Sequence, residues 1–148
     1  MTTSTATRVS SMDPAEFRVY NRLVEQMDYY HSVLRTRWND LYAGTAPHAA
    51  NPPSASRLIE MGLGFCQHLG FHHDIEEAHY FPVLGRKMEG FRANGFAKQQ
   101  HEEMHRGLDV LAEYLGECKR GEKDLQRKEV RTIMESFGVC CGGIWTTK

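Results

Sequence analysis

Hydrophobic side chains recur every three or four residues over most of the chain, which is the spacing of one face of an α-helix. The first such stripe follows Asp13-Pro14, a helix start in which Asp13 is the N-cap and Pro14 takes the first helical position. The glycine and prolines of residues 43–53 should end that helix in a loop. The stripe itself has one gap, filled by His31, and runs through Phe17, Tyr20, Val24, Met27, Leu34, Trp38 and Leu41.

Three further stripes predict three more helices. The second spans about 54–88, is capped by one of its first serines and should be kinked or briefly broken at Phe81-Pro82. The third spans about 95–119. The fourth begins around Glu122, and its pattern decays after Leu125, Val130, Ile133, Met134 and Phe137. No segment alternates as a strand does. The pattern predicts an all-α, up-down-up-down four-helix bundle whose fourth helix is truncated or irregular.

Length and composition limit the function classes. At 148 residues the chain is most simply one domain, residues 12–148, after a disordered Ser-, Thr- and Ala-rich start, residues 1–11. A formal net charge of −1 gives no basic excess for nucleic acid or an anionic membrane. No apolar run reaches the roughly 18 residues of a membrane span. With no signal peptide and no CxxC pair, we expect reduced thiols and a cytoplasmic location. The oligomeric state stays open.

Polar residues interrupt three apolar stripes where a helix should present Leu or Ile to the core. These are His31 in the first helix, His72 and Glu76 in the second, and His101 in the third. A buried His–Glu pair is costly unless a hydrogen bond or a cation satisfies it. His72 with Glu76, and His101 with His105, are spaced to share one helix face. Imidazole and carboxylate ligands suit iron, zinc or manganese, so these five residues are the candidate metal ligands.

Four neighbouring residues are weaker candidates. Glu77 is expected on a solvated face or as a carboxylate that orients a histidine, and His79 as a partly exposed residue. His68, one turn before the ligand pair of the second helix, is a minor candidate for a ligand. The role of His73 stays open.

In combination these residues resemble a known family. His31 in a long first helix, the segment from His72 through Glu76-Glu77 to Phe81-Pro82, and the pair His101 and His105 are similar to the hemerythrin-like, or HHE cation-binding, domain. The resemblance covers residues 16–137. It implies a four-helix bundle with a carboxylate-bridged, non-haem di-iron centre that binds dioxygen or a related small molecule. The implied ligands are His31, His72, Glu76, His101 and His105, with Glu76 bridging the metals.

The chain departs from this family in its fourth helix. There the family supplies one more histidine and one more carboxylate, whereas no His, Asp or Glu follows Glu135 here. The pattern runs instead into Cys140-Cys141 and two glycines. One iron, a zinc or a weakly held second metal therefore also fits, and a thiolate from either cysteine is a less favoured ligand.

Three functional interpretations follow. The first is a non-haem iron protein that binds dioxygen or a similar diatomic molecule, or that stores or senses iron. The second is a di-iron enzyme that activates oxygen or peroxide or handles nitric oxide. It is less favoured because no nucleophile is paired with a general base. The third is a metal-defective helical interaction module, which the missing fourth-helix ligands favour.

Overall fold

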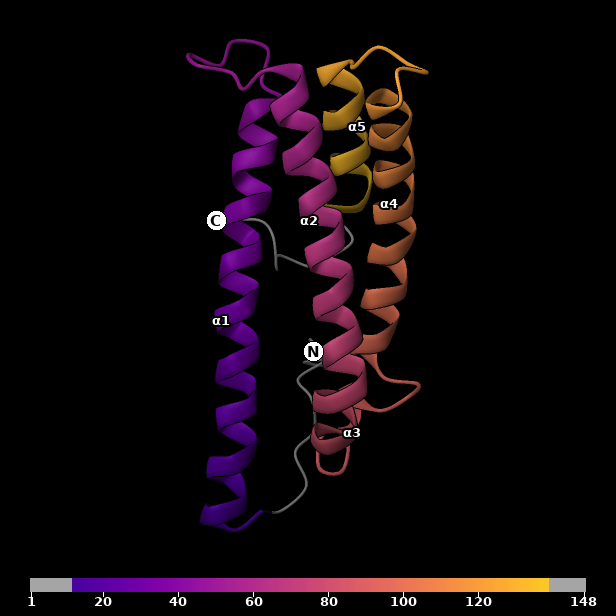
Figure 1. The fold of residues 1–148 in the computed structure, drawn as a ribbon. Helices are drawn as coiled ribbons and strands as arrows, with labels where there is room; N and C mark the ends of the chain where they lie inside the picture. The colour runs from indigo at the N-terminus through magenta and orange to yellow at the C-terminus, as the bar shows by residue number, and fades with distance from the viewer. Residues whose placement is uncertain (1–11, 139–148) are drawn as a thin grey trace, which may run out of the picture.

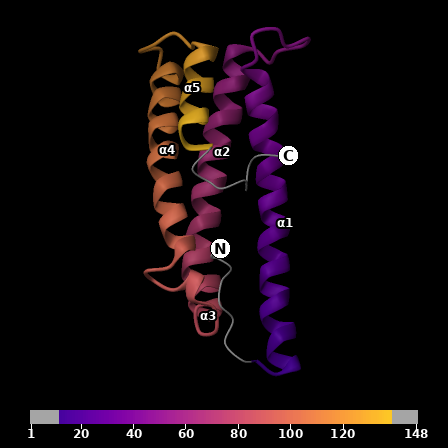
Figure 2. The ribbon, with the colours of Figure 1, turned by 180° about the vertical axis from the view of Figure 1, so that it is seen from behind.

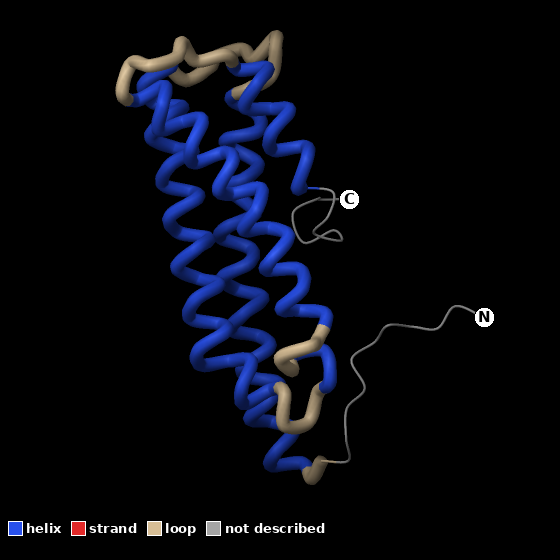
Figure 3. Tube along the Cα trace, turned by 90° about the vertical axis from the view of Figure 1, so that its right-hand side faces the viewer, coloured by secondary structure: helices blue, strands red, loops and turns tan. Residues whose placement is uncertain are grey.

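The computed structural model describes residues 12–138, in which all regular elements are helices (Figure 1). The long helices alternate in direction, with α1 and α4 running one way and α2 and α5 the other (Figures 1 and 2). Their connections lie at the two ends of the bundle (Figure 3). The predicted all-α bundle is thus confirmed. Its long helices are α1 (Pro14–Gly44), α2 (Ala55–Ile75), α4 (Phe96–Lys119) and α5 (Arg127–Gly138).

Two parts of the predicted organisation cannot be compared with the structure. The expected disordered start, residues 1–11, and the tail from 139 to 148 lie outside the described residues. Within the described part of the chain, no helix is both long enough and apolar enough to cross a membrane.

The starts of α1 and α2 both have side-chain caps. Asp13 and Glu16 form a capping box before α1: the Asp13 carboxylate accepts from the Glu16 N–H at 2.8 Å, and the Glu16 carboxylate accepts from the Asp13 N–H at 3.3 Å. At the start of α2 the hydroxyl of Ser54 accepts from the Arg57 N–H at 3.1 Å. Ser54 is therefore the cap of the second helix.

The second helix is not continuous to residue 88 as the pattern suggested. After α2 the chain widens into a π-helix, η1 (Glu76–Tyr80), and then forms one short α-helical segment, α3 (Phe81–Leu84). The 3₁₀-helix η2 (Glu89–Phe91) leads on to α4. Pro82 has no N–H to donate, and the π-helix before it lies where the sequence predicted a kink or a short break.

The fourth helix also begins later than predicted, at Arg127 rather than near Glu122. Gly121 follows α4 with a φ of 78°, a left-handed conformation that ends a helix and favours glycine. The N–H of Gln126 then donates to the hydroxyl of Tyr114 at 2.9 Å, which fixes the turn into α5.

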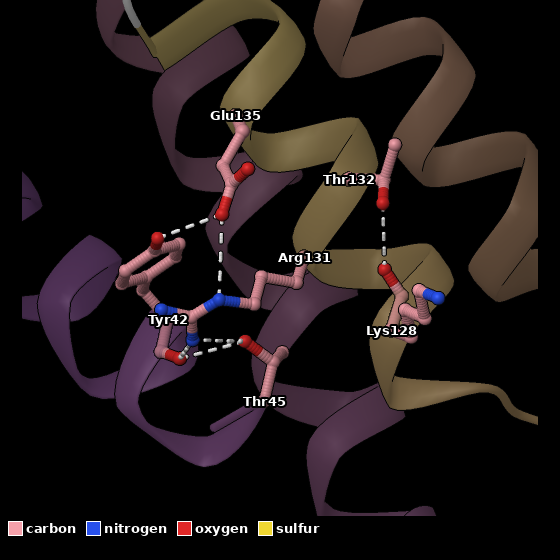
Figure 4. A network of polar contacts seen from close by, with 6 residues as sticks. All are labelled: Tyr42, Thr45, Lys128, Arg131, Thr132 and Glu135. Carbon is pink, nitrogen blue, oxygen red and sulfur yellow. Dashed lines mark hydrogen bonds and ion pairs between the residues drawn. The ribbon is translucent and has the colours of Figure 1, made fainter. Parts of the chain in front are cut away.

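Two arginines attach α5 to the end of α1. The guanidinium of Arg131 donates to the carbonyl of Tyr42 and to the hydroxyl of Thr45, both at 3.3 Å, and lies 3.8 Å from the Tyr42 ring centroid (Figure 4). The hydroxyl of Tyr42 donates to Glu135 at 2.8 Å. Arg127 donates to the carbonyl of Gly44 at 2.9 Å. These contacts satisfy carbonyls that the end of an α-helix leaves without partners.

The described part of α5 lies along only one half of the bundle (Figure 1). Its last described residues, Phe137 and Gly138, lie against Gly107 of α4 and Trp38 of α1. Beyond that level the described elements are α1, α2 with its extensions, and α4. The larger apolar cluster fills the four-helix half, and a smaller one of Tyr20, Met27, Phe81 and Leu84 lies in the other half.

Replacing Gly107 by alanine should weaken the attachment of α5. An added Cβ would overlap the ring of Phe137, which is 3% exposed and cannot move away freely. We expect a loss of about 1–3 kcal/mol in the free energy of unfolding, measured by urea denaturation. Gly64→Ala is the matched control, because nothing lies within 4 Å of its added Cβ. It should stabilise α2 by up to about 1 kcal/mol. Equal effects of the two changes would contradict this packing.

Candidate metal centre

A buried carboxylate lies at the centre of the candidate site. Glu76, the first residue of η1, is 1% exposed. Its Oε1 lies 2.5 Å from Nε2 of His72 in α2, 3.3 Å from Nε2 of His31 in α1 and 3.9 Å from Nε2 of His101 in α4. Three sequence-predicted histidines, one each from α1, α2 and α4, thus surround one oxygen atom of Glu76, which the sequence also predicted.

Three of these residues form a compact set of ligand atoms. The donor atoms of His31, His72 and Glu76 all lie within 4.8 Å of one another. The His31 and His72 rings meet edge to face, with centroids 5.2 Å apart, and each directs a nitrogen to the same carboxylate. His101 is outside this set, although it contacts the same oxygen. Two imidazoles and a carboxylate converging in this way can hold one transition-metal ion.

The carboxyl of Glu76 is ionised at neutral pH. Burial alone would raise its pKa, but the hydrogen bonds and electrostatic interactions with His31 and His72 outweigh burial and lower the pKa to about 2. The site therefore presents an anionic oxygen to any bound cation.

His101 is held between two aromatic rings. His73 stacks on it with centroids 3.7 Å apart and planes at 16°, and Phe81 lies on it at 4.9 Å and 30°. Its Nδ1 lies 3.8 Å from the Glu77 carboxylate, while Nε2 faces Glu76. Glu77 is thus placed beside a histidine as the sequence suggested. Burial lowers the pKa of His101 to about 4, so this imidazole is neutral at pH 7.

His73 is the residue that sequence reasoning missed. It is 2% exposed, and burial lowers its pKa to about 2. Adjacent residues of a helix point about 100° apart, so a single stripe could not bury both His72 and His73. Because α2 packs on both α1 and α4, its buried arc is wide enough for both. The two adjacent histidines, His72 and His73, are the sequence signal that α2 is buried over this wider arc.

The remaining histidines are placed differently. His105 lies beside His73, with ring centroids 5.1 Å apart, and is not among the atoms that gather around Glu76. His79 is exposed. His68 is partly buried, and burial lowers its pKa.

The cluster leaves several buried nitrogens without hydrogen-bond partners. They are Nε2 of His72, which is close to Glu76 but misaligned for a hydrogen bond, and Nδ1 of both His73 and His101. Each such buried atom costs about 1–3 kcal/mol if nothing satisfies it. Imidazole nitrogens around an ionised carboxylate form a donor set that suits a divalent transition-metal ion, so these residues fit a metal ion.

A cavity of about 300 Å³ adjoins this cluster, between α1 and α4. It lies beyond the described part of α5, and both His31 and Glu76 line it. Most of its other walls are apolar. They include Val24, Met27, Phe81, Phe91, Phe96, Ala97 and Met104.

The buried histidines should make the chelator-treated protein acid-sensitive. His73 and His101 have pKa values of about 2 and about 4 in the folded chain, below the roughly 6.5 of an unfolded histidine. The unfolded chain therefore binds more protons than the folded chain below pH 6.5. As the pH is lowered, the free energy of unfolding should decrease by up to about 1.4 kcal/mol per pH unit for each group. Glu76, with its pKa of about 2, should add a further loss below pH 4.5.

Urea denaturation at pH 7, 6 and 5 measures this dependence. His73→Gln removes one of the two titrating imidazoles and should reduce the slope by about half. An unchanged slope in that variant would show that His73 is not buried in its neutral form.

Comparison with known proteins agrees with this geometry. A search of curated proteins and a search of solved structures each gave no match. The family model of the hemerythrin HHE cation-binding domain matches residues 22–138, which include every histidine and carboxylate of the cluster. The match extends over most of the described chain, and the chain belongs to the hemerythrin HHE cation-binding domain family.

Proposed function

We propose that this protein binds non-haem iron at His31, His72 and Glu76, with His101 and His105 as further ligands and Glu76 as the bridging carboxylate. The observation that carries this proposal is the ionised Glu76 carboxylate, which is 1% exposed and contacted by nitrogens from three helices. An isolated buried charge is expensive, and a cation beside it removes most of that cost. Iron is favoured over zinc or manganese by family membership.

We further propose that the iron binds dioxygen or a related diatomic molecule, or that its occupancy reports iron availability. Bound iron supplies an open coordination position with redox chemistry. The chain itself would hold the ion in a largely buried site and keep the imidazoles of His73 and His101 neutral. Apolar walls such as Met27, Phe81 and Met104 favour an uncharged ligand in the adjoining cavity. The cytoplasmic location remains a prediction.

The size of the cavity favours a second candidate, a di-iron enzyme that activates oxygen or peroxide or handles nitric oxide. Its volume of about 300 Å³ is roughly ten times the 30 Å³ that one water occupies in the liquid. A diatomic ligand would leave most of that space to water or to a second reactant. Turnover of peroxide or nitric oxide by the iron-loaded protein would favour the enzyme over reversible binding.

Metal analysis tests the proposal directly. Protein purified with and without air should contain at least one iron per chain, and exposure of the ferrous form to dioxygen should change the visible spectrum reversibly. His72→Ala should lower iron affinity at least tenfold and remove most of the rise in melting temperature that iron causes, because binding to the folded state stabilises it. His48→Ala, an exposed histidine of the loop after α1, is the control and should change neither.

Other results would replace the proposal. Zinc or manganese in place of iron would identify a different metal protein and remove the dioxygen function. A folded helical protein that takes up no metal would favour the metal-defective interaction module.

A further inference from the structure

We propose that His73 joins His101 and His105 in a second metal site, built from α2 and α4, that takes iron or another divalent first-row transition ion. In this arrangement His73 takes the coordination position that a ligand from the last helix would otherwise fill. The inference rests on the proposed function in one respect, since both sites meet at Glu76. It adds a ligand that neither the apolar stripes nor the compact set around Glu76 includes.

The described part of α5 directs no ligand to this region. Its only residues with carboxylates are Glu129 and Glu135, and both are exposed. Glu135 is bound to Tyr42 and Arg131 beside the end of α1 (Figure 4). The described part of α5 ends level with Gly107, about a turn and a half of α4 from His101. No histidine follows His105 in the sequence, so a third imidazole for the α4 pair has to come from another helix.

His73 is the side chain in the right place. It stacks on His101 at 3.7 Å and meets the ring of His105 edge to face at 5.1 Å. It is 2% exposed, its Nδ1 has no hydrogen-bond partner, and it lines the same cavity as His31 and Glu76. A leucine in this position would avoid an unsatisfied nitrogen. A bound cation is the simplest way to satisfy this nitrogen together with Nδ1 of His101, which is also without a partner.

The stacked geometry sets one requirement. Two parallel rings cannot both hold one ion in their planes, so His73 or His101 must turn about its Cβ–Cγ bond when metal binds. Such a rotation is within the range of histidine, whose second side-chain torsion is broad. Three imidazoles leave further coordination positions to the Glu76 carboxylate and to an external ligand. His101 connects the two sites, since its Nε2 is 3.9 Å from Oε1 of Glu76.

Anaerobic titration with ferrous iron, with bound metal counted per chain, tests the inference. The unsubstituted chain should bind two ions, and His73→Ala should bind one, with the retained site unchanged in affinity. His73→Gln fills more of the space of the imidazole and should give the same count if alanine disturbs folding. The matched control is His79→Ala, an exposed histidine of η1, which should still bind two.

A parallel titration with cobalt(II) adds a readout of ligand type. Its visible bands depend on the number and kind of ligands, so loss of His73 should remove one set of bands and leave the other. Circular dichroism and the melting temperature of chelator-treated protein establish that each variant is folded. His73→Ala removes a buried nitrogen that has no partner, so without metal this variant should melt no lower than His79→Ala apart from the effect of the cavity that alanine leaves.

The outcomes separate this inference from the proposed function. Two ions bound by His73→Ala and His73→Gln, or one ion in the unsubstituted chain that these changes do not affect, would overturn the second site and leave the first intact. One ion that is lost with His73 but kept in His72→Ala would support the second site and overturn the first. No bound metal in any variant would overturn both.

Discussion

The structure depends most on one buried charge. Glu76 is ionised inside the bundle and is surrounded by imidazoles rather than by water. Without these partners, burying such a charge would cost more free energy than the whole free energy of unfolding of a small domain, which is only about 5–15 kcal/mol. The histidines that face it come from α1, α2 and α4, so the same interaction that makes the charge tolerable also ties three helices together.

Family membership and local geometry carry different parts of the functional conclusion. The match over residues 22–138 identifies a cation-binding domain but not which atoms bind the ion. The convergence of His31, His72 and Glu76 is the geometric basis of the proposed metal site, and a cavity adjoins these residues. The described part of α5 presents no residue to this cluster, whose histidines come from α1, α2 and α4.

Most of the fold could be predicted from the sequence, because the apolar stripes and caps are local signals. These local signals predicted the bundle, the Asp13 cap and the burial of Glu76. They did not predict where α5 starts or that a π-helix precedes Pro82, because both depend on how a turn or an extra residue is accommodated in space. His73 was missed for a similar reason: its burial depends on α2 packing against two helices at once.

The described part of α5 lies along only one half of the bundle, so the two halves of the described structure differ in cohesion. In one half four helices enclose most of the larger apolar cluster, while the described residues of the half that holds the histidines form three helices and the smaller cluster. Amide hydrogens in regions with fewer buried contacts exchange through local opening rather than global unfolding. A bound ion would therefore slow amide exchange first around Phe81 and Leu84, which belong to that smaller cluster.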